Sequence, residues 1–204
     1  MKRRDMIVDF PRPLAPLAAL SACFLLGGVL GAAFGGLMSD ACAQELADYL
    51  TAYLTLAREG GVTVEFWPVA WEQFRLLLAV ILLGLTALGV AGIPVLFGVR
   101  GFLLAFSVAG LCRVFGAAGL VPGVFLFGLP AFFWAPILFL TGAQCLNGAW
   151  VLLRRLMLES REPLPFTPTY WGRLGLWGAA MMVCVMLEYL AAPVLLTAAA
   201  KLVL

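Results

Sequence analysis

Long uncharged runs recur along the chain and set its predicted helices. One run lies between Arg12 and Asp40, and another lies between Arg75 and Arg100. A helix of about 20 apolar residues crosses the hydrocarbon core of a bilayer, so each run predicts a transmembrane helix. We predict five such helices, at about residues 14–38, 76–95, 101–120, 124–153 and 174–200. The tail after Pro193 is too short to span again, and either prolongs the fifth helix or lies at the interface.

Two proline-containing breaks separate the predicted helices. Gly92-Ile93-Pro94 marks the end of the second helix, and the turn GLVPG at 119–123 lies between the third and the fourth. Proline lacks a backbone N–H and interrupts helical hydrogen bonding, which is why these positions are read as boundaries.

The segment at about residues 40–72 follows a different pattern. Leu46, Leu50 and Tyr53 recur at helical spacing among polar residues, which predicts an amphipathic helix on the outer side of the membrane. Two interpretations stay open: the segment packs on its own bundle, or it presents a docking surface to a partner. Near its end, Trp67 and Trp71 are predicted aromatic anchors at the outer interface.

Composition agrees with the run pattern. The chain is 64% hydrophobic and 12% charged, whereas soluble domains are about 25% charged. The first run is about 25 residues long, longer than the roughly 7–15 apolar residues of a secretory signal, so we expect a retained helix. No basic cluster is interleaved with aromatic residues, which argues against nucleic-acid binding.

The distribution of charge predicts the orientation of the helices. Lysine and arginine concentrate on the cytoplasmic side of membrane proteins. Placing the N-terminus inside puts these basic residues in the cytoplasm: Lys2, Arg3, Arg4, Arg12, Arg100, Arg154, Arg155, Arg161 and Arg173. The segment 40–72 is then outside, and it is strongly acidic. The predicted fold is a single all-α membrane domain, a bundle of five transmembrane helices with the N-terminus inside and the C-terminus outside.

Small residues predict where helices approach each other. Gly27, Gly31 and Gly35 form a GxxxGxxxG row on the first helix, and Gly101 begins a similar row on the third. Such rows let helix backbones come close together in lipid. They pack either within this bundle or against a partner, and a second copy of the chain is one such partner.

Polar residues inside the fourth predicted helix give a further candidate. Gln144 and Asn147 lie three residues apart and share one helix face. They are interpreted as hydrogen-bonding groups between helices, with a transport site as the alternative.

Arg113 and Glu188 are the ionisable residues placed deepest in the predicted helices. An ionised group in the middle of a span costs at least about 2.5 kcal/mol. At 1.5 Å per residue, we place Arg113 and Glu188 at heights of about 19 and 22 Å above the inner ends of their helices. We therefore predict an ion pair between them. In the alternative, each side chain reaches the outer interface separately, and Glu188 as a proton carrier is the least favoured interpretation.

The residue inventory argues against catalysis. The chain contains no histidine, and its five cysteines include no CxxC pair. It has no glycine-rich phosphate loop and no nucleophile adjacent to a base. We predict no catalytic, metal or cofactor site, and a protein that is not an enzyme.

Short motifs in a fixed order complete the sequence evidence. The stretch from Gly92 to Gly142 contains Gly92-Ile93-Pro94, Arg100-Gly101, Phe106-Ser107-Val108-Ala109-Gly110, Val121-Pro122 and Leu129-Pro130. GGVLGAAFGGLMS precedes it, followed by an acidic segment rich in tyrosine and leucine, and LEYLAAPVL follows it. In this order the motifs resemble the stage II sporulation protein M family over most of the chain.

The resemblance implies a multi-pass protein in the cell membrane of an endospore-forming bacterium. It implies a scaffold that gathers peptidoglycan-degrading enzymes, an amidase and a lytic transglycosylase, at the septal membrane during engulfment. The expected partners are therefore membrane lipid and these two hydrolases. The alternative function is a transporter or permease-like subunit that works with a separate ATPase.

Overall fold

The computed structural model describes residues 14–58, 65–158 and 166–203. Apart from short connections such as residues 37–39 and 85–88, these residues are helical, and they contain no strand. Five helices are long and apolar enough to cross a membrane. They are α1 (Leu14–Gly36), α3 (Phe66–Gly84), α4 (Gly89–Phe115), α6 (Leu129–Leu158) and α7 (Pro168–Val203). The chain is thus an all-α, multi-pass membrane bundle, as the run pattern predicted.

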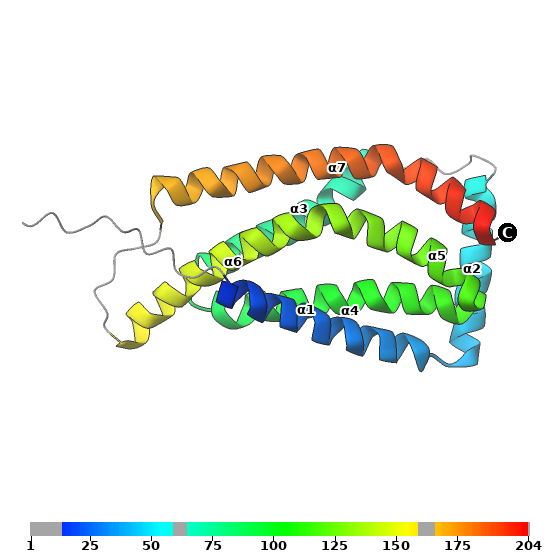
Figure 1. Cartoon of the computed structure of the whole chain (residues 1–204), viewed down its shortest axis with the longest axis horizontal. Coiled ribbons are helices and arrows are strands. Elements are labelled where there is room, and N and C mark those ends of the chain that lie inside the picture. Colours follow the sequence, from blue (N-terminus) through cyan, green and yellow to red (C-terminus); the bar gives the residue numbers. More distant parts are fainter. Residues whose placement is uncertain (1–13, 59–64, 159–165, 204) are drawn as a thin grey trace, which may run out of the picture.

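Successive long helices run in opposite directions along the bundle. Figure 1 shows α1 starting at one end and the C-terminus at the other, as an odd number of spans requires. Arg154, Arg155 and Arg173 lie near the ends of α6 and α7, at the end of the bundle where α1 begins. The other predicted cytoplasmic residues, except Arg100, fall outside the described ranges. The inside orientation of this end remains a prediction from charge.

The second and third transmembrane helices differ from their predicted bounds. The predicted helix at 76–95 is α3, which begins ten residues earlier at Phe66 and ends at Gly84. The chain reverses at residues 85–88, and Gly92-Ile93-Pro94 lies inside α4. Membrane helices tolerate such a proline because neighbouring groups satisfy the freed carbonyl. The boundaries were misplaced because Arg75 and Arg100 were taken as helix ends, although both lie inside helices.

The predicted break at 119–123 is a short reversal that begins earlier. Gly116 has a φ of 62°, in the left-handed region that glycine adopts readily. A 3₁₀ turn at Gly116–Gly119 (η1), a helical turn at Leu120–Gly123 (α5) and a π-helical turn at Val124–Gly128 (η2) then lead into α6. The tail after Pro193 prolongs α7 to Val203, which is the first of the two alternatives.

The closest packing in the bundle joins α1 to α4. Gly27, Gly31 and Gly35 are buried. A Cβ atom added to Gly31 would lie 2.1 Å from the Phe102 carbonyl oxygen, and one on Gly101 would lie 2.1 Å from the Phe24 oxygen. Side chains are excluded on both helices, so the predicted glycine rows meet each other within this chain.

The side of α1 away from α4 carries large apolar side chains. Leu25, Leu26 and Val29 are all more than half exposed. In the membrane this face contacts lipid, because exposed leucine and valine are stable there. The buried core lies between the helices and includes Phe97, which makes an edge-to-face contact with Phe139 at 4.9 Å between ring centroids.

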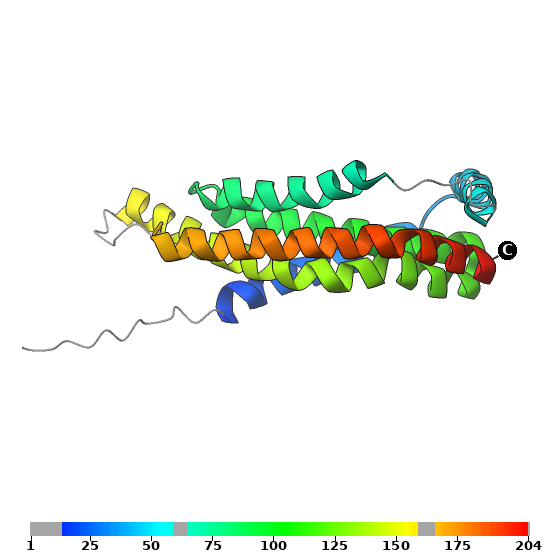
Figure 2. The same cartoon turned by 90° about the horizontal axis from the view of Figure 1, so that it is seen from above.

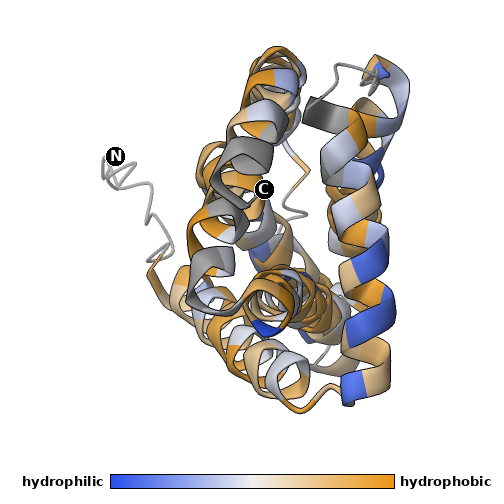
Figure 3. Cartoon of the chain, turned by 90° about the vertical axis from the view of Figure 1, so that its right-hand side faces the viewer, coloured by the Kyte–Doolittle hydropathy of each residue, from blue (hydrophilic) through white to orange (hydrophobic). Residues whose placement is uncertain are grey.

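Helix α2 (Asp40–Arg58) lies across the end of the bundle opposite to the basic end. Figures 1 and 2 show it nearly perpendicular to the long helices, and Figure 3 shows hydrophilic residues along it. It contacts α4 and α7. The predicted amphipathic helix is therefore present in 40–58 and packs on its own bundle. Residues 66–72 of the predicted outer segment belong instead to α3, and 59–64 lie outside the described ranges.

Candidate functional site

Arg100 lies inside the bundle rather than at its cytoplasmic edge. It is 11 residues after the start of α4 at Gly89, which corresponds to about 16 Å along the helix. Its guanidinium donates to Glu72 Oε1 on α3 at 3.2 Å. The same guanidinium lies over the ring of Trp134 on α6, at 4.6 Å from the centroid. The carboxylate and the aromatic face together offset the cost of an arginine at this depth.

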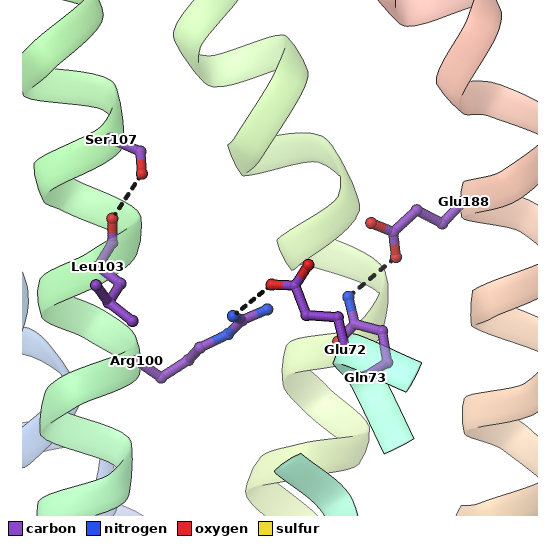
Figure 4. Close-up of polar contacts among 6 residues, drawn as sticks. All are labelled: Glu72, Gln73, Arg100, Leu103, Ser107 and Glu188. Carbon is purple, nitrogen blue, oxygen red and sulfur yellow. Dashed lines mark hydrogen bonds and ion pairs between the residues drawn. The ribbon is translucent and has the colours of Figure 1, made fainter. Parts of the chain in front are cut away.

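Gln73 and Glu188 form a second polar contact beside the first. Gln73 is adjacent to Glu72 on α3 and is only 4% exposed. Its side-chain nitrogen donates to Glu188 Oε2 on α7 at 3.0 Å, across 115 positions of sequence. Figure 4 shows the two contacts side by side, with Arg100 reaching Glu72 and Gln73 reaching Glu188. Together they join α3, α4 and α7 through polar groups.

A cavity of about 390 Å³ lies between these side chains. Its polar lining consists of Glu72, Gln73, Arg100, Ser107 and Glu188, and its apolar lining includes Leu126, Phe127, Pro130 and Trp134. The lining therefore comes from α3, α4, η2, α6 and α7. The Ser107 hydroxyl donates to the Leu103 carbonyl of its own helix, at 2.9 Å.

The cavity lies within the membrane-spanning segments. Glu72 and Gln73 are in the span Phe66–Gly84, and Glu188 is in the span Pro168–Leu195. Helix α3 begins well short of the level that α4 and α7 reach (Figures 1 and 2). Glu72 is therefore near the middle of the bundle although it follows Phe66 by only six residues. Ionisable groups inside spans indicate a functional site by default, because they are costly to keep there.

Two polar atoms in this region have no hydrogen-bond partner within the described part of the chain. They are Gln73 Oε1 and Arg100 Nε, both buried. A buried acceptor or donor without a partner is destabilising. The site is therefore under-satisfied as it stands, even though its main charged groups are paired.

The predicted ion pair between Arg113 and Glu188 is not formed. Arg113 pairs with Asp40 at the start of α2, and Glu188 pairs with Gln73. The depth estimate failed because α4 begins at Gly89, so Arg113 lies about 36 Å from its inner end rather than 19 Å. Arg113 instead lies at the end of the bundle where α2 packs, as in the alternative that each side chain reaches the outer interface separately, and its pair with Asp40 fastens α2 to the bundle. Glu188 stays inside the bundle.

The other predicted residues lie away from the cavity. Gln144 donates to the Tyr170 carbonyl at 3.0 Å and so links α6 to α7. Asn147 is half-buried on the same helix. This bond gives Gln144 a structural contact and does not bring it to the cavity. Trp67 and Trp71 are exposed on the first turns of α3, at 72% and 54%. Because α3 begins short of the level that α4 and α7 reach, they do not lie at the outer end of the bundle, where they were predicted as anchors.

Sequence reasoning missed Glu72, Gln73 and Arg100 because it assigned them to the flanks of helices. A signal was available. A window that begins at Phe66 is apolar enough to span in spite of its charged residues.

The described residues contain no group of three His, Cys, Asp or Glu side chains placed to hold a metal ion. Comparison of the chain with protein-family models, curated proteins and solved structures gave no match.

Proposed function

We propose that this chain is a non-enzymatic scaffold of the cell membrane that assembles peptidoglycan hydrolases at the septal membrane during engulfment in endospore formation. The sequence motifs that resemble the stage II sporulation protein M family support this role. The structural observation that carries it is α2, a helix held across the outer end of the bundle.

Helix α2 is attached at several points. Asp40 pairs with Arg113 at its start. Leu46 lies beside Gly110 of α4, with its Cδ2 atom 3.5 Å from where a Cβ on that glycine would be. A helix fastened in this way keeps one face toward the bundle and presents the other in a fixed orientation.

The outer face of α2 is both acidic and aromatic. Glu45, Asp48 and Tyr49 are exposed, and Tyr49 stacks, with 6.5 Å between ring centroids, on Tyr53, which lies on the same side of the helix as Leu46. Tyr49 is 68% exposed. Exposed aromatic side chains on a rigid element are common anchors of protein interfaces. This face is where we expect a membrane-anchored hydrolase to bind.

A photo-crosslinking amino acid at Tyr49, introduced in sporulating cells, tests the proposal. The expected product is an adduct with an amidase or a lytic transglycosylase. The matched control is the same amino acid at Phe132 on α6, which is 74% exposed but faces the side of the bundle. Recovery of no cell-wall hydrolase from α2, or equal recovery from both positions, would count against the scaffold.

A second candidate function is a transporter or permease-like subunit acting with a separate ATPase. The observation that favours it is the charged cavity between α3, α4 and α7, since polar groups at mid-depth often mark solute paths. Affinity purification of the tagged chain from native membranes separates the two functions. Co-purification of an ATPase without a hydrolase would favour the transporter.

A further inference from the structure

The charges around the cavity do not balance. Its lining contains the two carboxylates of Glu72 and Glu188 and the single guanidinium of Arg100. Arg100 is already engaged by Glu72 and by the face of Trp134. Arg75 lines a neighbouring cavity with Glu72 but does not line this one. With all groups ionised, the site carries one net negative charge, centred on Glu188.

Hydrogen-bonding capacity is unmet on the same side of the cavity. The bond from Gln73 occupies one oxygen of the Glu188 carboxylate. Gln73 is itself 96% buried, and its own Oε1 has no partner among the described residues. On the Glu188 side both groups accept hydrogen bonds, so a ligand placed there must donate them; the other unpartnered atom, the donor Arg100 Nε, belongs to the side chain that reaches Glu72. Since a low-dielectric site strengthens such bonds, a donor that is also a cation fits best.

We propose that this cavity binds a small organic cation with a primary ammonium group. The ammonium donates to the Glu188 carboxylate and, after the Gln73 side chain turns its buried Oε1 toward the cavity, to that oxygen as well, and its charge balances the site. Leu126, Phe127 and Pro130 enclose its apolar body. This inference does not rest on the proposed scaffold function, because a scaffold and a transporter are both compatible with a bound amine.

The size and lining of the cavity select among ligand classes. A volume of about 390 Å³ lies within the range of small-molecule sites, roughly 300–1,000 Å³. A bare metal ion is disfavoured because hard cations take about six or more oxygen ligands, and here Glu72 Oε1 already accepts from Arg100 and Glu188 Oε2 from Gln73. An anion is disfavoured by the net negative charge, because Arg100, whose Nε is without a partner in the described part of the chain, is already paired through its Nη1 with Glu72.

A smaller cavity of about 120 Å³ continues from the site along α7. It shares Leu126, Pro130 and Glu188 with the main cavity and adds Ala192 and Leu195. Both added residues lie beyond Glu188 toward the outer end of the helix. This smaller cavity therefore extends the site toward the C-terminal end of α7, and the cavity of about 200 Å³ that includes Arg75 shares Glu72, Arg100 and Leu103 with it.

Binding of labelled phenethylamine to the purified full chain in lipid nanodiscs tests the proposal. Phenylpropionate has a similar body with the opposite charge, and phenylalanine carries both charges. We expect saturable binding of the amine, weaker binding of phenylalanine and none of phenylpropionate. Absence of amine binding at millimolar concentration, equal binding of phenylpropionate, or displacement of the amine by sodium alone would each overturn the proposal.

Two variants locate the binding. Glu188→Gln removes the charge but keeps a group that can bond to Gln73, and should weaken amine binding at least tenfold. Gln73→Met removes the unpaired acceptor and should also weaken it, which provides a second measurement if the first variant does not fold. The matched control is Glu45→Gln on α2, which removes a carboxylate far from the cavity. Unchanged amine affinity in the folded Glu188 or Gln73 variant would refute the assignment.

Discussion

The contact between α1 and α4 allows a quantitative prediction from a single methyl group. A Cβ on Gly31 would lie 2.1 Å from the Phe102 carbonyl oxygen, where real Cβ atoms stay beyond 3.0 Å. Gly31→Ala therefore forces the two helices apart locally by about 1 Å, or leaves an overlap of that size. The obstacle is backbone, so no side chain can rotate to relieve it. We expect the free energy of unfolding to fall by about 1–3 kcal/mol, the usual cost of overpacking.

Gly28, three residues before Gly31 on the same helix, provides the matched control. A Cβ there would be 3.8 Å from the Cβ of Ala105, which is an ordinary contact. Alanine is favoured over glycine inside a helix by up to about 1 kcal/mol, so Gly28→Ala should be neutral or stabilising. Unfolding by titration with sodium dodecyl sulfate, followed by tryptophan fluorescence, measures both variants. Equal unfolding free energies for the two would refute the packing argument.

Three further predictions address other parts of the bundle. Reversing the charge at either residue of the Asp40–Arg113 pair should lower the protease resistance of α2, and reversing both charges, in the variant Asp40→Arg with Arg113→Asp, should restore it. No recovery in the double variant would show that the pair does not hold the helix. Gln144→Met should cost about 0.5–1.5 kcal/mol of unfolding free energy through the lost bond to the Tyr170 carbonyl, and an unchanged value would contradict that role. Cys42 is exposed on α2 and should react with a membrane-impermeant maleimide in intact cells. Labelling that occurs only after permeabilisation would show that α2 lies on the cytoplasmic side, opposite to the predicted orientation.

The helices could be predicted from the sequence where hydropathy alone decides them. The predicted helix in the uncharged run before Asp40 corresponds closely to α1, because no charge interrupts the run. Its glycine row also indicated that another helix packs closely against it. Helix α2 was also predictable, because Leu46, Leu50 and Tyr53 give one amphipathic period. In both cases the information is local.

The site could not be predicted because its stability depends on distant partners. Arg100 was taken as a helix end, yet Glu72 and Trp134 make its position inside the bundle tolerable. The bond between Gln73 and Glu188 joins residues 115 positions apart. Once Arg100 had been assigned to a boundary, α4 was too short and every depth counted from it was wrong. The failed pairing of Arg113 with Glu188 follows from that one error.

The meeting of α1 with α4 also has a consequence for biosynthesis. Helix α1 ends at Gly36 and α4 begins only at Gly89. When α1 enters the bilayer, the helix that fits its glycine surface has not yet been synthesised, and α2 and α3 must be made first. The glycine surface of α1 therefore stays in contact with lipid, or with whatever assists insertion, until α4 arrives. A ribosome-bound chain truncated before Gly89 should leave α1 open to cross-linking by insertion factors, and release should coincide with the emergence of α4.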